Sequence, residues 1–154
     1  MRAVVQRVAR ASVRVEADLV SEIRGGVLVF LGVTHGDSVE TAGRLAAKVS
    51  ALRLFEDTDG RMNLCLADVG GEVLCVSQFT LYGDLRRGNR PSFTAAAPPG
   101  IAAPLYERFC LAIEGAGLAC RRGVFGAHME VELVNDGPVT LILDTAEFDR
   151  PRRA

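Results

Sequence analysis

The sequence predicts an α+β fold: a single compact domain in which about two helices pack on largely antiparallel or mixed sheets. The 154 residues are about the length of one domain, and 49% of them are hydrophobic. Short apolar or alternating runs typical of strands recur along the chain, whereas only two longer segments have helical spacing. Because we find no repeat and no linker, we assign residues 1–145 to one domain and residues 146–154 to a loosely attached polar tail.

Strand-like runs occur in six places. Most alternate apolar and polar residues or are short, but the run at 27–33 is continuously apolar, as expected of a central strand buried on both faces. The six runs are residues 2–8, 13–15, 27–33, 73–79, 129–133 and 139–143. The last two are separated by the turn-like segment Asn135–Pro138, so we expect them to form a hairpin. Short strands at 54–55 and 62–64 are expected around the turn at 57–60.

Two segments have helical character. Asp37, followed three residues later by Glu40, resembles a helix start, and apolar residues recur at helical spacing over residues 38–52. Pro104 lies where a second helix can begin, and apolar residues after it share one face as far as Ala116. The stretch 83–100 between the two contains three glycines and three prolines and predicts a loop.

Composition excludes several classes of protein. The net charge of −1 argues against a surface coated in basic residues for nucleic acid, although not against a local basic patch. The longest apolar run, Val27–Leu31, is too short to span a bilayer, and the N-terminal residues have no signal-peptide core. We therefore expect a cytoplasmic protein with no membrane partner.

Cysteine usage indicates no disulfide framework or metal centre, and we expect no cofactor. The four cysteines form no close pair. Cys75 and Cys110 fall in a predicted strand and a predicted helix, where buried inert thiols are expected. Cys120 precedes two arginines that could lower its pKa, so a cysteine nucleophile stays open as an alternative.

The segment Ser77-Gln78-Phe79-Thr80 follows an apolar strand and contains no histidine, cysteine or acid. Spacing alone favours a strand end with hydrogen-bonding polar side chains. The alternative is a catalytic site in which the main-chain N–H groups near Gln78 and Phe79 converge on a reacting carbonyl oxygen. Ser77 or Thr80 could instead be a nucleophile, but either hydroxyl would need an activating base.

Side-chain bases are scarce in this chain, since His35 and His128 are its only histidines. His35 lies in a turn-like segment, and His128 shares the polar face of a predicted strand with Glu130. A Ser–His–Asp triad would need an unproven long-range meeting of residues. A metal site at His128 and Glu130 lacks a third ligand.

The segment Asn135–Thr140 contains the dipeptide Gly137-Pro138 between two predicted strands. A tight turn would explain it without any function. A cis peptide bond is the alternative, although only about 5–6% of X–Pro bonds in folded proteins are cis. Carbonyl groups re-aimed by a cis bond could line a pocket and reject one enantiomer of a substrate.

Six segments together resemble the D-aminoacyl-tRNA deacylase family, and the resemblance is collinear over residues 1–145. The segments are residues 1–8, 62–64, 76–81, 90–93, 125–129 and 135–140. The resemblance implies a homodimeric enzyme that hydrolyses the ester between a D-amino acid and the terminal adenosine of tRNA. It further implies that glycine mischarged on tRNA is a substrate, and that the terminal 2′-hydroxyl of the tRNA helps to activate water.

The resemblance also implies roles for the first segment. Ser77, Gln78 and Phe79 would bind the terminal ribose and adenine and orient the ester, and the amide near Phe79 would stabilise the oxyanion. Thr80 is the second choice, as a nucleophile. The tRNA acceptor end is the implied partner of this site.

Gly137 and Pro138, joined by a cis bond, would reach into the active site of the partner subunit and exclude L-amino acids with their carbonyls. Arg7 would brace this Gly–Pro segment, and Met129 would form part of the pocket wall. Without the resemblance, Arg7 would be a solvent-facing charge on a strand and Met129 a core methionine.

Two other functions remain open. One is a non-catalytic RNA-binding module, for which Arg86, Arg87 and Arg90 near the first segment would serve equally well. The other is a serine or cysteine hydrolase of small esters that uses Ser77, Thr80 or Cys75.

Overall fold

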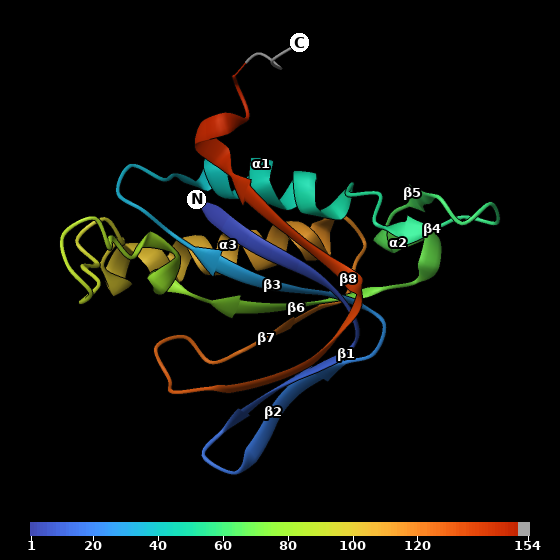
Figure 1. Cartoon of the computed structure of the whole chain (residues 1–154), viewed down its shortest axis with the longest axis horizontal. Helices are drawn as coiled ribbons and strands as arrows, with labels where there is room; N and C mark the ends of the chain where they lie inside the picture. Colours follow the sequence, from blue (N-terminus) through green and yellow to red (C-terminus); the bar gives the residue numbers. More distant parts are fainter. Residues whose placement is uncertain (151–154) are drawn as a thin grey trace.

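The computed structural model describes residues 1–150 of the chain and contains a mixed six-stranded sheet with helices on one face (Figure 1). The strand order is β2-β1-β3-β6-β7, and β8 pairs with the other edge of β1. These strands are β1 (Arg2–Val15), β2 (Asp18–Ile23), β3 (Gly26–Gly32), β6 (Glu72–Ser77), β7 (Cys120–Arg122) and β8 (Glu130–Asp144). A separate small sheet consists of β4 (Phe55–Glu56) and β5 (Met62–Leu64).

Helices connect the parallel strands of the sheet. The structure contains α1 (Val39–Ser50), α2 (Leu66–Val69) and α3 (Pro99–Gly115), with 3₁₀ turns η1 (Phe79–Tyr82) and η2 (Thr145–Glu147). Strands β3 and β6 are parallel, as are β6 and β7, so α1 and α3 lie in the two crossover connections. The α+β prediction is confirmed, with one short additional helix, α2.

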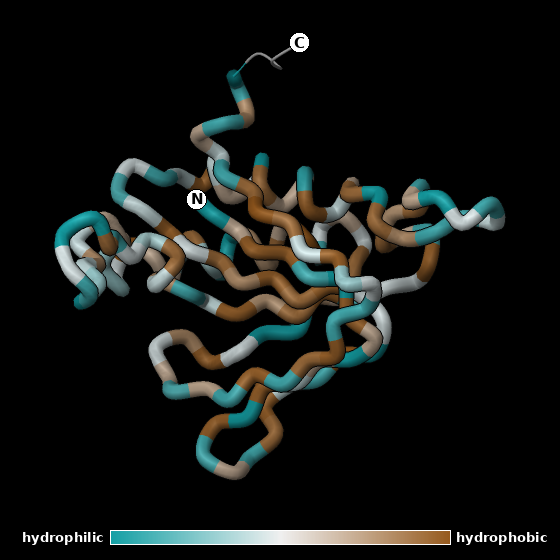
Figure 2. Tube along the Cα trace, in the orientation of Figure 1, coloured by the Kyte–Doolittle hydropathy of each residue, from teal (hydrophilic) through white to brown (hydrophobic). Residues whose placement is uncertain are grey.

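Two apolar clusters lie on opposite faces of the central strands. One contains α1, α3 and the inward side chains of β1, β3 and β6, including Val5, Val29 and Phe109. The other contains Leu28, Leu74 and residues from the distal half of β1, with β8 side chains packed against it. Strand β3 is therefore buried on both faces, as its continuous apolar run predicts. Figure 2 shows apolar residues concentrated along the central strands.

The predicted hairpin at the end of the chain is wrong, because residues 130–144 form one long strand. Both halves of β8 pair antiparallel with β1, whose 14 residues offer hydrogen-bonding partners along the whole length. Thr140 lies opposite Gln6 and Asn135 lies opposite Val8, so Arg7 faces the extra residues 136–139. These residues form a bulge in the ladder rather than a chain reversal.

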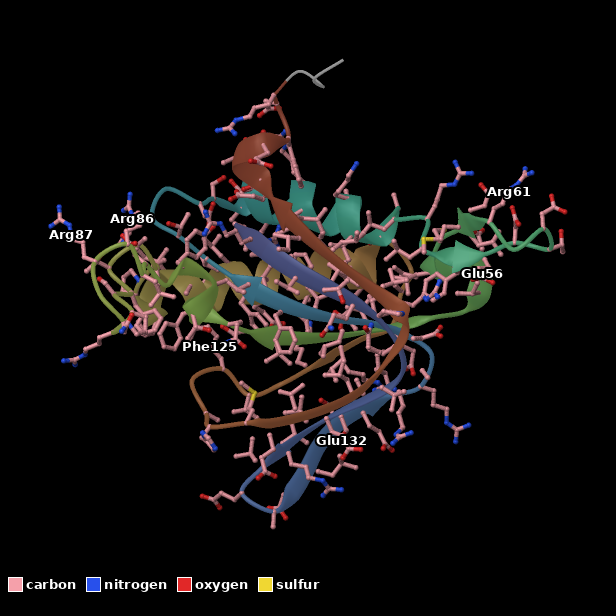
Figure 3. All side chains as sticks on the ribbon, in the orientation of Figure 1. Glu56, Arg61, Arg86, Arg87, Phe125 and Glu132 are labelled. Atoms are coloured by element: carbon pink, nitrogen blue, oxygen red, sulfur yellow. The ribbon has the colours of Figure 1, made fainter. Side chains whose placement is uncertain are left out.

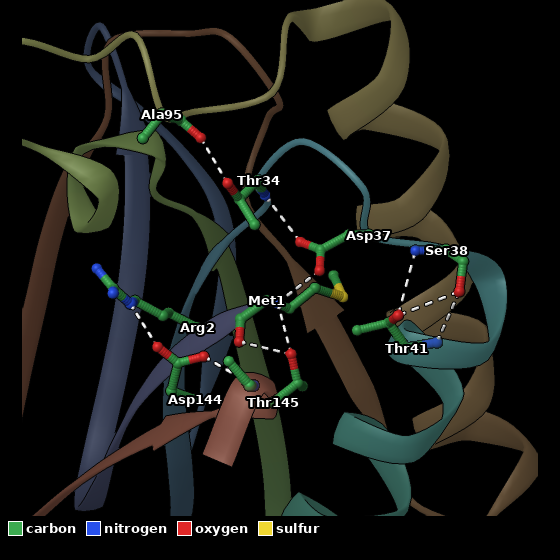
Figure 4. Close-up of polar contacts among 10 residues, drawn as sticks. Met1, Arg2, Thr34, Asp37, Ser38, Thr41, Ala95, Asp144 and Thr145 are labelled. Carbon is green, nitrogen blue, oxygen red and sulfur yellow. Dashed lines mark hydrogen bonds and ion pairs between the residues drawn. The ribbon is translucent and has the colours of Figure 1, made fainter. Parts of the chain in front are cut away.

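Two helix starts also differ from the prediction. The N-cap of α1 is Ser38, which forms a capping box with Thr41. The Asp37 carboxylate instead accepts a bond from the Thr34 amide (2.8 Å) and another from the Met1 amino group (2.7 Å) (Figure 4). Helix α3 begins at Pro99. Proline is tolerated there because the first N–H groups of a helix have no acceptor within it. Pro104 lies inside the helix.

The described part of the predicted tail contacts α1 rather than extending freely. Phe148 packs against the main apolar cluster, and Arg44 Nη2 forms an ion pair with Asp149 Oδ1 at 2.7 Å. Residues 151–154 of the predicted tail lie outside the described residues. No helix in the described part of the chain is both long and apolar enough to cross a membrane.

Candidate active site

A cavity of about 550 Å³ opens where β3 and β6 end. Its walls are mainly aromatic and aliphatic, and we call it the aromatic cavity. The lining residues are Val33, Val76, Ser77, Gln78, Phe79, Phe93, Ala96–Pro99, Ala102, Phe125–Met129 and Val131. His128 is the one ionisable side chain in this lining. The cavity therefore offers an apolar enclosure with few polar groups, which is typical of a small-molecule site.

The first predicted segment lies at the mouth of this cavity. Ser77 is the last residue of β6, and the Gln78 amide donates to the Leu31 carbonyl at 2.8 Å, which anchors the segment to β3. Phe79 and Thr80 then begin η1, so their N–H groups have no acceptor within that turn. Of the two amides expected to converge on a substrate, only that of Phe79 is unused by the sheet.

Thr80 is in the segment but not in the cavity lining. Its hydroxyl oxygen accepts a hydrogen bond from the side-chain amide of Gln78. Ser77, Gln78 and Phe79 do line the cavity. The structure therefore brings three of the four predicted residues together and leaves Thr80 as a partner of Gln78.

Aromatic rings form the walls of the cavity. Phe79 and Phe93 make an edge-to-face contact with ring centroids 5.0 Å apart, and Phe125 lies 6.0 Å from the Tyr106 ring. Met129 lines the cavity and also packs against the second apolar cluster, so it lies in both the cavity wall and the core. The sequence predicts only a loop at residues 96–99, and no pattern there indicated that it forms the remaining wall.

Within residues 1–150, no hydrogen bond joins either histidine to a serine, threonine or cysteine side chain. His35 Nε2 contacts the Thr94 carbonyl (3.0 Å) and does not line the cavity. Burial raises the pKa of the Cys75 thiol well above its usual value. Hydrogen bonding to Cys110, together with burial, likewise raises the pKa of Cys120 and outweighs the lowering effect of Arg122. Nor do the described residues contain a cluster of three or more His, Cys, Asp or Glu side chains suited to a metal ion.

The Gly137–Pro138 peptide bond is cis and lies in the bulge of β8. Gly137 has φ of +133°, and an added Cβ would lie 2.7 Å from Val139 Cγ2. The side-chain amide of Asn135 closes the base of the bulge by donating to the carbonyls of Arg7 (2.9 Å) and Val139 (3.1 Å). The bulge is therefore a shaped main-chain element built around a glycine.

Arg7 holds this bulge from below and is buried, so the expectation of a solvent-facing charge is wrong. Its Nε donates to the Asp136 carbonyl (3.1 Å) and its Nη1 to the Leu54 carbonyl (2.5 Å). Its position follows from strand alternation, because it continues the inward row of Ala3 and Val5 on β1.

The two predicted segments do not meet within one chain. Arg7 is level with Val27 and Val73 in the sheet, whereas Ser77 is level with Leu31, four residues further along. That offset is roughly 13 Å along the strands. Across the sheet, β8 and β6 are three strand spacings apart, which adds roughly 14 Å. Figure 1 likewise shows β6 ending at one side of the molecule and β8 bending at the other.

The fold and the cavity define a class of protein: a single-domain α+β protein with an apolar, aromatic-walled cavity where β3 and β6 end. Residues 4–144 match the model of the D-Tyr-tRNA(Tyr) deacylase family. The chain belongs to this family and is a hydrolase of the D-aminoacyl-tRNA deacylase type.

Individual relatives agree with this assignment. The chain is 55% identical to D-aminoacyl-tRNA deacylase of Chloroflexus aurantiacus, over 100% of this chain and 96% of the relative. It is 58% identical to that of Thermotoga petrophila, over 96% and 99% of the two chains. A solved structure called c-Myc DNA Unwinding Element Binding Protein has a TM-score of 0.87 at 40% identity, over 94% and 98% of the two chains.

A more distant solved structure shares the fold. It is described as a probable eukaryotic D-amino acid tRNA deacylase and has a TM-score of 0.78 at 17% identity, over 92% of this chain and 97% of that chain.

Proposed function

We propose that this chain hydrolyses the ester between a D-amino acid and the terminal adenosine of tRNA, releasing the free amino acid and tRNA. The observation that carries the proposal is the aromatic cavity at the end of β6, where the unused Phe79 amide stands beside aromatic walls. Relatives that match nearly the whole chain are named for this activity. Because the substrate and its enzyme would meet during translation, we place the protein in the cytoplasm.

The proposed mechanism uses main-chain groups of the protein and a hydroxyl group of the RNA. Phe79 and Phe93 supply faces and edges against which adenine can stack. Ser77 and Gln78 offer polar groups to the ribose, and the Phe79 N–H stabilises the oxyanion when water adds to the carbonyl carbon. The 2′-hydroxyl of the terminal ribose assists the water, and the 3′-oxygen leaves with a proton. This assistance accounts for a site without a side-chain nucleophile.

The proposed chiral filter is the Gly137–Pro138 bulge of a second copy of the chain. The aromatic cavity of one chain does not contain its own bulge, so the filter requires a homodimer. The exposed edge of β8 supports such an assembly, because Leu141 and Ile142 are apolar there and Ile142 is 78% exposed. Main-chain carbonyls at this position would clash with the side chain of an L-amino acid. Glycine carries no side chain to exclude and would be hydrolysed.

The test is deacylation of one tRNA charged in parallel with the D- and L-forms of the same amino acid. We expect rapid loss of the D-ester alone. Loss of both esters would disprove the chiral filter. Loss of neither, with tRNA still bound, would favour the non-catalytic RNA-binding module.

A further inference from the structure

The loop between η1 and α3 contains a second cavity, lined mainly by arginines. The Asp84 amide donates to the Ser92 carbonyl at 2.8 Å, and the Ser92 amide donates back to Asp84 at 2.9 Å. These two bonds close residues 84–92, which we call the arginine loop. The loop surrounds a cavity of about 450 Å³ lined by Asp84, Arg86, Arg87, Arg90 and Ser92.

The charge of this cavity is positive. Its lining contains three guanidinium groups and one carboxylate, Asp84, which pairs with Arg86 through Nη2 (2.6 Å) and Nε (2.9 Å). The Arg86 guanidinium lowers the pKa of Asp84 to about 2, so this carboxylate is ionised at neutral pH. Within residues 1–150, Arg87 and Arg90 have no acidic partner. Two positive charges therefore remain on a protein whose net charge is −1.

The arginine loop lies directly beside the aromatic cavity. Ser92, which closes the loop, precedes Phe93, whose ring forms the cavity wall and contacts Phe79 at 5.0 Å. At the other end of the loop, a Cβ on Gly83 would lie 3.1 Å from the Phe93 ring. In Figure 3, Arg86 and Arg87 project from the same end of the molecule as Phe125, and Arg61 lies at the opposite end.

We propose that the arginine loop binds the sugar–phosphate backbone of the tRNA acceptor end, on the nucleotides that precede the terminal adenosine. The planar guanidinium groups of Arg87 and Arg90 would contact phosphate oxygens, a geometry that arginine suits. Asp84 keeps Arg86 within the loop and leaves the other two arginines for the ligand. The contact is independent of sequence and positions the strand so that its last nucleotide enters the aromatic cavity.

This inference rests on the proposed function, so its test uses two substrates that carry the same ester, of which only one has the nucleotides preceding the terminal adenosine. One is D-aminoacyl-tRNA and the other is the same D-amino acid esterified to adenosine. The variants are Arg87→Ala, Arg90→Ala and their combination. Arg61→Ala and the pair Arg61→Ala with Lys48→Ala are matched controls, because they remove the same charge from exposed positions elsewhere.

We expect each loop substitution to raise the KM for D-aminoacyl-tRNA about tenfold, with kcat unchanged and hydrolysis of the adenosine ester unaffected. The slope of log KM against log salt concentration should fall by about 0.7 for each arginine removed. Effects on both substrates alike, or equal effects of the loop and control variants, would overturn the inference.

Equilibrium binding of uncharged tRNA separates this inference from the proposed chemistry. Weaker binding by the loop variants, with binding by the controls unchanged, would support the arginine loop even if the wild-type protein hydrolysed neither substrate. A wild-type protein that hydrolyses neither substrate would disprove only the proposed deacylation. Unchanged binding by the loop variants would defeat the inference while leaving deacylation untouched.

Discussion

Arg7 Nε lies 3.1 Å from the main-chain oxygen of Asp136, so a buried cation on β1 supports the residue that precedes Gly137. The same guanidinium forms a 3.2 Å ion pair with the Asp136 carboxylate and reaches the carbonyl of Leu54 beyond α1. The β8 bulge is thereby tied both to its neighbouring strand and to the segment between α1 and β4.

Replacing Arg7 should destabilise the protein and loosen the bulge. Arg7→Ala leaves the carbonyls of Leu54 and Asp136 without their charged donor, and we expect the free energy of unfolding to fall by about 3 kcal/mol. Arg10→Ala is the matched control on the same strand, because its 3.6 Å pair with Glu132 is exposed, and it should change stability by less than about 0.5 kcal/mol. Urea denaturation measures the free energy of unfolding of both variants. Equal losses would show that the buried contacts of Arg7 stabilise the protein no more than the exposed ion pair of Arg10 does.

Gly137→Ala should also be destabilising, by about 1–3 kcal/mol, because φ of +133° is unfavourable for alanine. The added Cβ would in addition lie 2.8 Å from the Val139 amide nitrogen. Gly100→Ala in α3 is the control, since its Cβ would meet nothing within 4 Å, and it should melt no lower than wild type. The measurement is thermal unfolding of both variants. A Gly137 variant as stable as the Gly100 control would contradict the predicted strain at Gly137.

Thr80→Ala should retain measurable turnover of D-aminoacyl-tRNA. The Thr80 hydroxyl is engaged by Gln78 and does not line the aromatic cavity, so the proposed mechanism gives it no covalent role. Single-turnover deacylation is the measurement, with circular dichroism to verify folding. Complete loss of activity in a folded variant would revive a threonine nucleophile.

His128→Gln should leave kcat for D-aminoacyl-tRNA unchanged, because the proposed mechanism assigns no proton transfer to this side chain. His128 is the one ionisable side chain in the cavity lining, so it is the residue best placed there to act as a general base. Single-turnover rates at saturating enzyme, for both proteins on the same charged tRNA, provide the comparison. Loss of turnover in a folded variant would assign His128 a catalytic role.

A substrate that ends in 2′-deoxyadenosine should react poorly, because the proposed mechanism relies on the terminal 2′-hydroxyl to assist water. The comparison is the single-turnover rate for otherwise identical D-aminoacyl-tRNAs, at enzyme concentrations that saturate binding. Normal rates on the deoxy substrate would remove the RNA from the proposed mechanism.

Local patterns were sufficient for much of the fold. The apolar run of β3 predicts a strand buried on both faces, and helical spacing predicts α1, because both patterns depend on residues close in sequence. The sequence predicts a hairpin at β8 because Gly137-Pro138 is a turn signal, whereas a bulge forms because β1 is long enough to pair with both halves of β8. The sequence predicts the α3 start at Pro104 rather than Pro99 because both prolines are compatible with a first helical turn.

The sequence by itself determined the class of fold and, through segments resembling a known family, the residues Ser77, Gln78 and Phe79 as the candidate site. The tertiary structure alone decided that Arg7 is buried beneath the β8 bulge, that Phe93 and residues 96–99 enclose the cavity, and that Gly137 lies far from Ser77. The reason is physical: side-chain periodicity depends on neighbours a few residues away, whereas burial and proximity depend on strand register across the sheet.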